Sequence, residues 1–282
     1  MALDKDELVL VTPSDHLIKD ELEYEKVLEK AKELAIKNNL VTFGITPTFA
    51  ETGFGYIESI KESFNVKAFH EKPDVQTAQK YVNAGNYYWN SGMFMFKAGV
   101  FLDELKKYSP EIYEGCERAL LNSPEQVRGT EKTEQTFGQS PEQVRGTEKM
   151  KQSSISTEPR IYSGLIRIKH DDMIAIAEDS IDYAVMEKSN KVKVIPSDIK
   201  WSDVGSFDAL FEELPKDKDG NTINKNHISI GSKNNLIYGK DKKIATVDIE
   251  DMIIVDTGDA LLISKKGSSQ KVKEIVKEIL AN

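Results

Sequence analysis

The sequence contains only one cysteine, Cys116, in 282 residues. A single thiol excludes an intrachain disulfide, so the fold cannot depend on such bonds. No apolar run is long enough to span a bilayer, and no stretch has the composition of a secretory signal. We therefore expect a cytoplasmic protein that does not enter a membrane, since a reducing compartment suits a chain without disulfides.

The chain also lacks an excess of positive charge, because 47 acidic residues outnumber 38 lysines and arginines and give a net charge of −9. This balance argues against broad binding to nucleic acid or to an anionic membrane surface. It leaves small anionic substrates open, because these need only a few local lysines. The chain is 39% hydrophobic and long enough for two domains or one large one, so an ordinary buried core is expected.

The first structural signal is an apolar run, Leu8 to Val11, that leads directly into the turn residues of "PSDH". Such a run predicts a buried strand of a parallel sheet. A helix is predicted next, because Asp20 can cap it and Glu23 stands three residues later. Another apolar strand follows over 40–47. Strand, helix and strand predict a parallel βαβ unit with a right-handed crossover.

Further elements follow along the predicted α/β core. The patterns predict a short strand pair around 54–73, a helix over 78–85, a strand over 87–97 that contains Gly92, a helical stretch over 100–120 broken at Pro110, a helix over 180–189 and a strand over 192–197. From about residue 220, short strands separated by Gly, Asn and Asp predict a small all-β unit.

A polar repeat interrupts this pattern. The string SPEQVRGTEK occurs at 123–132 and again at 140–149. Because the repeat lacks an apolar face, we favour a solvated insert over 123–156, with a binding role as the less favoured alternative. The predicted domains are a core of 1–219 that carries this insert and a β unit of 220–282 with a closing helix. An apolar stripe is expected to dock that helix on the β unit; it consists of Val272, Ile275, Val276, Ile279 and Leu280.

Two aspartates follow predicted strands and are candidates for metal binding. Asp15 belongs to "PSDH" and Asp203 to "WSDVGSF", where Gly205 would let a ligand approach the backbone. Each aspartate alone is more often a turn or cap residue. Brought together, two carboxylates would suit Mg²⁺, a hard cation that takes oxygen ligands and substrate phosphates.

Three other short strings hold residues that could bind a sugar phosphate. In "FHEKP", Glu71 can accept from sugar hydroxyls and Lys72 can neutralise a phosphate; the alternative is an exposed ion pair. Asn90 of "NSGMF" offers an amide, although this string also fits a turn or bulge. Glu187 and Lys188 of "MEK" fit a solvated helix end equally well. His16 and His70 have no partner at metal-ligand spacing, so a structural role is favoured for both.

The strings PSDH, TGFGYIE, FHEKP, WNSGMFMF, SIDYAVMEK and WSDVGSF occur in this order. Each string is unspecific alone, but the ordered set closely resembles bacterial mannose-1-phosphate guanylyltransferases, of the kind often fused to a phosphomannose isomerase. The resemblance covers nearly the whole chain except the repeat. It implies a Rossmann-like nucleotidyltransferase α/β core followed by a small left-handed β-helix-like domain.

The resemblance also implies a reaction and a set of roles. GTP and mannose 1-phosphate would give GDP-mannose and pyrophosphate, with Mg²⁺ as cofactor and a homodimer as the assembly. Asp15 and Asp203 resemble the metal pair, and together with Lys72 they would form the catalytic set. The other matching positions resemble substrate contacts: Gly55, Tyr56, Glu71, Asn90 and Glu187 on the sugar, with Lys72 and Lys188 on phosphate.

The sequence departs from the family pattern at three points. Phe207 replaces a tryptophan, the repeat is added, and the glycine-rich loop that would precede the first strand is missing. We therefore expect a truncated chain with an N-terminally incomplete core that does not turn over alone. The alternative to an enzyme is a non-catalytic sugar-phosphate-binding fragment. An acyltransferase-like β-helix protein is disfavoured because no hexapeptide repeat occurs.

Overall fold

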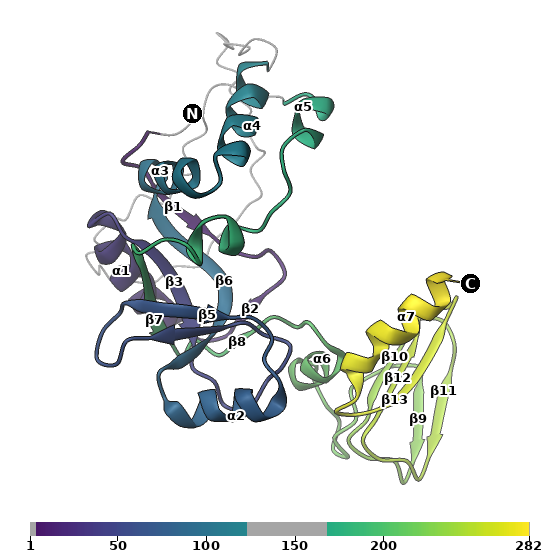
Figure 1. Cartoon of the computed structure of the whole chain (residues 1–282). Helices are drawn as coiled ribbons and strands as arrows, with labels where there is room; N and C mark the ends of the chain where they lie inside the picture. Colours follow the sequence, from purple (N-terminus) through teal and green to yellow (C-terminus); the bar gives the residue numbers. More distant parts are fainter. Residues whose placement is uncertain (1–3, 123–167, 282) are drawn as a thin grey trace, which may run out of the picture.

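The computed structural model describes residues 4–122 and 168–281. The predicted insert, with both copies of the repeat, lies outside these residues. Figure 1 shows a core followed by a smaller C-terminal unit. The core contains β1 (Leu8–Val11), β2 (Leu17–Ile18), α1 (Glu21–Ile36), β3 (Leu40–Ile45), β4 (Tyr56–Ser59), β5 (Val66–His70), α2 (Val75–Ala84), β6 (Tyr87–Lys97), α3 (Ala98–Tyr108), α4 (Pro110–Leu121), α5 (His170–Ile174), a π-helical turn (Asp182–Met186), β7 (Val192–Ser197), β8 (Trp201–Ser202) and α6 (Phe207–Glu213).

The helix predicted after the first strand is confirmed as α1, and its start follows from local chemistry. The carboxylate of Asp20 accepts a hydrogen bond from the backbone N–H of Glu23 at 3.0 Å, which satisfies one of the free donors of the first turn. Val27, Ala31 and Ala35 recur at helical spacing and are buried. The amphipathic pattern therefore lays α1 against the sheet.

The long strand β6 organises the sheet of the core. One edge of β6 pairs with β4 near its start and with β1 near its end, and the opposite edge pairs with β3. All three pairings are antiparallel, whereas β3 and β7 are parallel. The predicted α/β core is thus confirmed, with a mixed sheet in the order β5-β4-β6-β3-β7 and β1 beside β6.

Two expectations for β1 are wrong. The strand does not neighbour β3, because β6 lies between them and runs antiparallel to both. Nor is β1 fully buried, since Leu10 keeps 42% of its surface exposed. Within the described residues β1 pairs with β6 alone, so its other edge has no strand neighbour. An apolar run indicates a strand but not the number of its neighbours.

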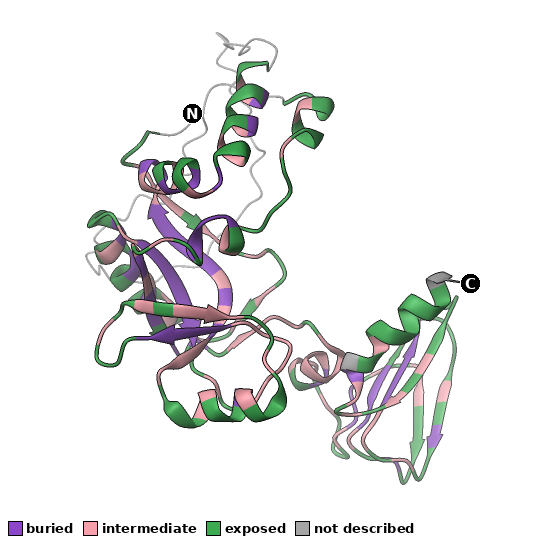
Figure 2. Cartoon of the chain, viewed as in Figure 1, coloured by how far each residue is buried: buried purple, intermediate pink, exposed green. Residues whose placement is uncertain are grey.

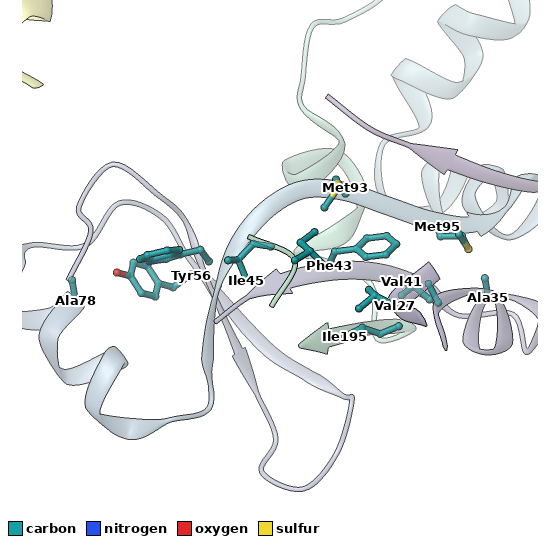
Figure 3. Close-up of a cluster of buried hydrophobic side chains, with 13 residues drawn as sticks. Val27, Ala35, Val41, Phe43, Ile45, Tyr56, Ala78, Met93, Met95 and Ile195 are labelled. Atoms are coloured by element: carbon teal, nitrogen blue, oxygen red, sulfur yellow. The ribbon is translucent and has the colours of Figure 1, made fainter. Parts of the chain in front are cut away.

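A hydrophobic cluster packs against the strands that position the candidate site. Phe43 of β3 and Ile195 of β7 pack against the buried face of α1, as Figure 3 shows. Tyr56 and Trp89, which pair across β4 and β6, belong to the same cluster and are almost fully buried. Figure 2 shows the central strands as the buried part of the core. Residues next to Tyr56 and Trp89 therefore stand on rigid backbone.

The helical stretch after β6 breaks at the predicted place, with α3 ending at Tyr108 and α4 starting at Pro110. The buried carboxylate of Glu104 on α3 holds the segment 189–191, which follows the π-helical turn. It accepts hydrogen bonds from the hydroxyl of Ser189 at 2.6 Å and from the ammonium of Lys191 at 2.8 Å. Burial raises the pKa of Glu104, but the bonds from Lys191 and Ser189 outweigh this and lower it overall.

Replacing Glu104 by leucine is expected to destabilise the chain by about 1.5–3 kcal/mol, because two hydrogen bonds to a buried charge are lost. The folded-state pKa of Glu104 lies below its unfolded value. Its stabilising effect is therefore present above the unfolded pKa and lost as the pH falls through the folded one. Urea titrations at neutral and acidic pH measure both effects. Asp103→Asn, an exposed change on the same helix, should have little effect at either pH.

The C-terminal unit is built from five short strands and a closing helix. Its elements are β9 (His227–Ile230), β10 (Leu236–Gly239), β11 (Ile244–Val247), β12 (Met252–Asp256), β13 (Leu261–Lys265), a 3-10 turn (Ser269–Lys271) and α7 (Val272–Ala281). Residues 227 and 244 pair in parallel, as do 236 and 253, so the chain coils with a repeat of 17 residues. The predicted β-helix-like unit is confirmed.

The expected docking of α7 on the β unit is wrong. Ile275, Val276 and Ile279 remain 48%, 45% and 65% exposed. Periodicity correctly predicted the apolar stripe, but a sequence pattern does not show which surface covers it.

None of the described helices has the length and apolarity needed to cross a membrane.

Candidate active site

Five of the sequence-predicted substrate residues line one cavity of about 240 Å³. These are Gly55, Tyr56, Glu71, Asn90 and Glu187. They come from the start of β4, the end of β5, the middle of β6 and the residue after the π-helical turn. Because β4 pairs with β6, Gly55 and Asn90 lie side by side. The backbone N–H of Asn90 donates a hydrogen bond to the carbonyl of Gly55 at 2.8 Å.

The cavity also contains an acid that the sequence analysis missed. Asp182 accepts a hydrogen bond from the side-chain amide of Asn90 at 3.0 Å. The available signal was its position five residues before Glu187. In the π-helical turn the backbone N–H of Glu187 donates to the carbonyl of Asp182, which places both residues at the same cavity. Single π turns are rare and often occur at functional sites.

The cavity is strongly acidic, because Glu71, Asp182 and Glu187 all line it. Burial raises the pKa of Asp182, and the nearby charge of Glu71 raises it further, against the bond from Asn90. Burial also raises the pKa of Glu187, with Asp182 and Glu71 adding to the effect. Carboxylates and the amide of Asn90 can accept hydrogen bonds from neutral hydroxyl groups, whereas the negative carboxylates would repel a phosphate.

Gly55 allows Glu71 to reach the cavity. A Cβ atom at Gly55 would lie 2.8 Å from Oε2 of Glu71. That is too close for contact, so the two side chains cannot occupy these positions together.

Gly55→Ala is expected to push the Glu71 carboxylate aside and to weaken sugar-phosphate binding about tenfold. The melting temperature should change little, because the clash is with the end of a flexible side chain. Isothermal titration with mannose 1-phosphate measures the first effect and calorimetry the second. Gly85→Ala serves as the contrasting glycine variant: it has open space around it but lies at the end of α2 with a φ of 74°, so it should lower the melting temperature and leave the affinity unchanged. Unchanged affinity in Gly55→Ala would show that Glu71 does not need its present position.

The two lysines predicted to contact phosphate differ in placement. Lys72 forms an ion pair with Glu71 at 3.0 Å and adopts a positive φ of 39°, which is strained for a non-glycine residue. The bond and charge of Glu71 raise the pKa of Lys72. Lys72 therefore stands beside the acidic cavity. Lys188 is exposed next to Glu187 and does not line this cavity.

The two candidate metal ligands flank a second, very short strand pair. Leu17 of β2 pairs with Ser202 of β8, so Asp15 and Asp203 extend from the same end of this pair. The side chain of Asp15 is 82% exposed, and Oδ1 of Asp203 accepts from the backbone N–H of Gly205 at 3.0 Å. Val204, which lies between Asp203 and Gly205, has a φ of 48°. This value is an outlier for a β-branched residue and indicates local constraint.

These oxygen donors fit a hard divalent cation. No group of three or more His, Cys, Asp and Glu side chains within the described ranges could hold a metal ion. Asp203 also lines a larger cavity of about 610 Å³ between the core and the C-terminal unit.

The chain matches a known family of proteins. Residues 1–220 match the family model described as nucleotidyl transferase, so the chain belongs to the nucleotidyl transferase family. Residues 225–279 match a model described as a MannoseP isomerase/GMP-like beta-helix domain. Nucleotidyl transferases generally use a divalent metal ion, in agreement with the donor set of the site.

Relatives of known name point in the same direction. The chain is 39% identical to the mannose-1-phosphate guanylyltransferase of Salmonella muenchen and 36% identical to that of Escherichia coli. Both alignments cover 99% of this chain but 52% of the relative, so the chain spans about half the length of these curated proteins. The resemblance noted from the ordered strings is confirmed.

A solved structure supports the fold. A protein from Thermus thermophilus, titled a mannose-1-phosphate geranyltransferase, superposes with a TM-score of 0.72. The alignment covers 97% of this chain and 70% of that protein at 24% identity. The predicted order of an α/β core followed by a β-helix-like unit is therefore shared with a solved fold.

Proposed function

We propose that this chain serves the transfer of a guanylyl group from GTP to mannose 1-phosphate, which yields GDP-mannose and pyrophosphate. The observation that carries the proposal is the acidic cavity, in which predicted substrate residues from four separate segments meet. Named guanylyltransferases among the relatives support the choice of substrates.

The charges of the site orient the sugar phosphate. Glu71, Asp182 and Glu187 repel phosphate but accept from hydroxyl groups, so the sugar ring enters the cavity. Its phosphate stays outside the carboxylates, where Lys72 next to Glu71 offers a cation. We assign the sugar contacts to Gly55, Tyr56 and Asn90 together with these acids, and we leave Lys188 as a peripheral phosphate contact.

The chemistry needs positioning rather than an enzyme nucleophile. An oxygen of the sugar phosphate forms a bond to the α-phosphorus of GTP while the bond to the β-phosphate oxygen breaks and pyrophosphate leaves. Lys72 lowers the repulsion between the reacting phosphates. Asp15 and Asp203 would hold Mg²⁺, which neutralises phosphate charge when bound.

Two measurements on the same protein test this function. Isothermal titration determines whether mannose 1-phosphate binds, and a pyrophosphate assay with GTP and Mg²⁺ determines whether it reacts. Binding and turnover together support guanylyl transfer. Binding without turnover is the result expected for the chain alone. If turnover stays absent when the glycine-rich loop of the family pattern is supplied as a peptide, the alternative of a non-catalytic sugar-phosphate-binding protein is favoured. Turnover with glucose 1-phosphate at an equal rate would contradict the choice of sugar, and absence of any binding would reject both functions.

Two further expectations accompany the proposal. The single cysteine fits a cytoplasmic, reducing compartment. The homodimer remains a prediction, which light scattering of the purified chain would test.

A further inference from the structure

A continuous row of aromatic rings runs alongside both parts of the proposed site, and four of its rings line the larger cavity that Asp203 also lines. The rings of Phe49 and Trp89 are 5.0 Å apart, those of Trp89 and Phe54 are 5.3 Å apart, and those of Phe54 and Trp201 are 5.5 Å apart. The row ends with His16, whose ring lies 5.2 Å from that of Trp201. All four contacts are edge-to-face, a geometry that constrains the orientation of neighbouring rings.

Each inner member of this row stands one or two residues from a proposed site residue along the chain. Phe54 directly precedes Gly55, and Trp89 directly precedes Asn90. On the other side, Trp201 stands two residues before Asp203. The row therefore joins the backbone of the sugar-binding cavity to the backbone of the carboxylate pair.

The two tryptophans of the row are held firmly, and Phe54 fills the space between them. Trp89 is 5% exposed and belongs to the main core. Trp201 donates a hydrogen bond from Nε1 to Nδ1 of His16 at 3.2 Å, which fixes its ring beside β2. Phe54 touches both tryptophans but is only partly buried. A smaller side chain at Phe54 would leave the tryptophans without their shared neighbour.

We propose that Phe54 is a positioning residue that sets the spacing between the sugar-binding cavity and the Asp15–Asp203 pair. This role rests on the proposed function, because both parts of the site must act on one sugar phosphate. Loss of the ring would let the segment 201–203 and the start of β4 shift relative to each other. Ligands at both places would then bind less tightly, although Phe54 itself need contact neither.

The test compares Phe54→Leu with two matched variants. Phe54→Tyr keeps the ring, and Phe49→Leu makes the same change in the same loop but at the outer end of the row, where the ring touches Trp89 and is 54% exposed. Affinity for mannose 1-phosphate is measured by titration calorimetry, and affinity for Mn²⁺ alone by electron paramagnetic resonance. The chain has two tryptophans, and both touch Phe54, so their fluorescence reports the local change.

In Phe54→Leu both affinities should fall about fivefold to tenfold, because two ring contacts are lost. Phe54→Tyr should restore both, and Phe49→Leu should leave both within about twofold. Melting curves confirm that each variant is folded at the assay temperature. If the wild-type chain binds both ligands and Phe54→Leu binds them equally well, the positioning role is wrong. If only one affinity falls, Phe54 does not link the two parts. A wild-type chain that binds neither ligand would reject the proposed function itself.

Discussion

When the glycine-rich loop of the family pattern is supplied, Asp203→Asn is expected to lower guanylyl transfer by a factor on the order of 10²–10³, since charge stabilisation through a metal is worth several kcal/mol in the transition state. The substitution keeps the size of the side chain and its bond to Gly205 but removes the negative charge. Steady-state rates measured across a range of Mg²⁺ concentrations test this expectation. Mn²⁺ binding should weaken in parallel, because Asp15 would be the one remaining carboxylate ligand.

The matched control is Asp198→Asn. Asp198 lies five residues earlier, is 76% exposed and pairs with Lys200 at 3.3 Å. Exposed pairs of this kind contribute little, so its rate and Mn²⁺ affinity should match the wild type. Normal turnover in Asp203→Asn would remove Asp203 from the metal site. A fall in rate with unchanged Mn²⁺ affinity would assign it a different role.

Local signals predicted local structure well. Asp20 and the apolar spacing that follows it predicted α1, and Pro110 predicted the break between α3 and α4. The strand pair β4 and β5 also follows from local patterns. Capping, proline geometry and alternation act within a few residues, so a single sequence contains them in full.

The same patterns could not predict which strands pair with each other or which apolar surfaces are covered. The insertion of β6 between β1 and β3 depends on residues far apart in the chain. The stripe on α7 was visible in the sequence, but its exposure was not. In the candidate site, Glu71 and Asn90 were first singled out by the chemistry of their short strings, and the family resemblance then suggested their roles. Asp182 was missed because a regular helix with 3.6 residues per turn does not place residues five apart at one cavity.

Asp182→Asn is expected to make the chain more stable and its site weaker. Burial and then the charge of Glu71 raise the folded-state pKa of Asp182 above the unfolded value. The folded chain therefore binds more protons between these two values, and its stability falls as the pH rises through that window. Above this window the ionised form carries the cost in full. Asparagine avoids the cost and can still accept from Asn90.

At a pH above this window, the melting temperature of Asp182→Asn should rise by roughly 2–4 °C, the shift that about 1 kcal/mol produces in a domain of this size. Below the unfolded pKa the gain should vanish, because Asp182 is then protonated in both states. The affinity for mannose 1-phosphate should fall about tenfold, since a hydroxyl loses a charged acceptor. Glu178→Gln, an exposed change four residues earlier, should alter neither quantity. A stabilised variant that binds normally would show that Asp182 lines the cavity without contacting the sugar, and a destabilised one would show that its charge is satisfied in the folded state.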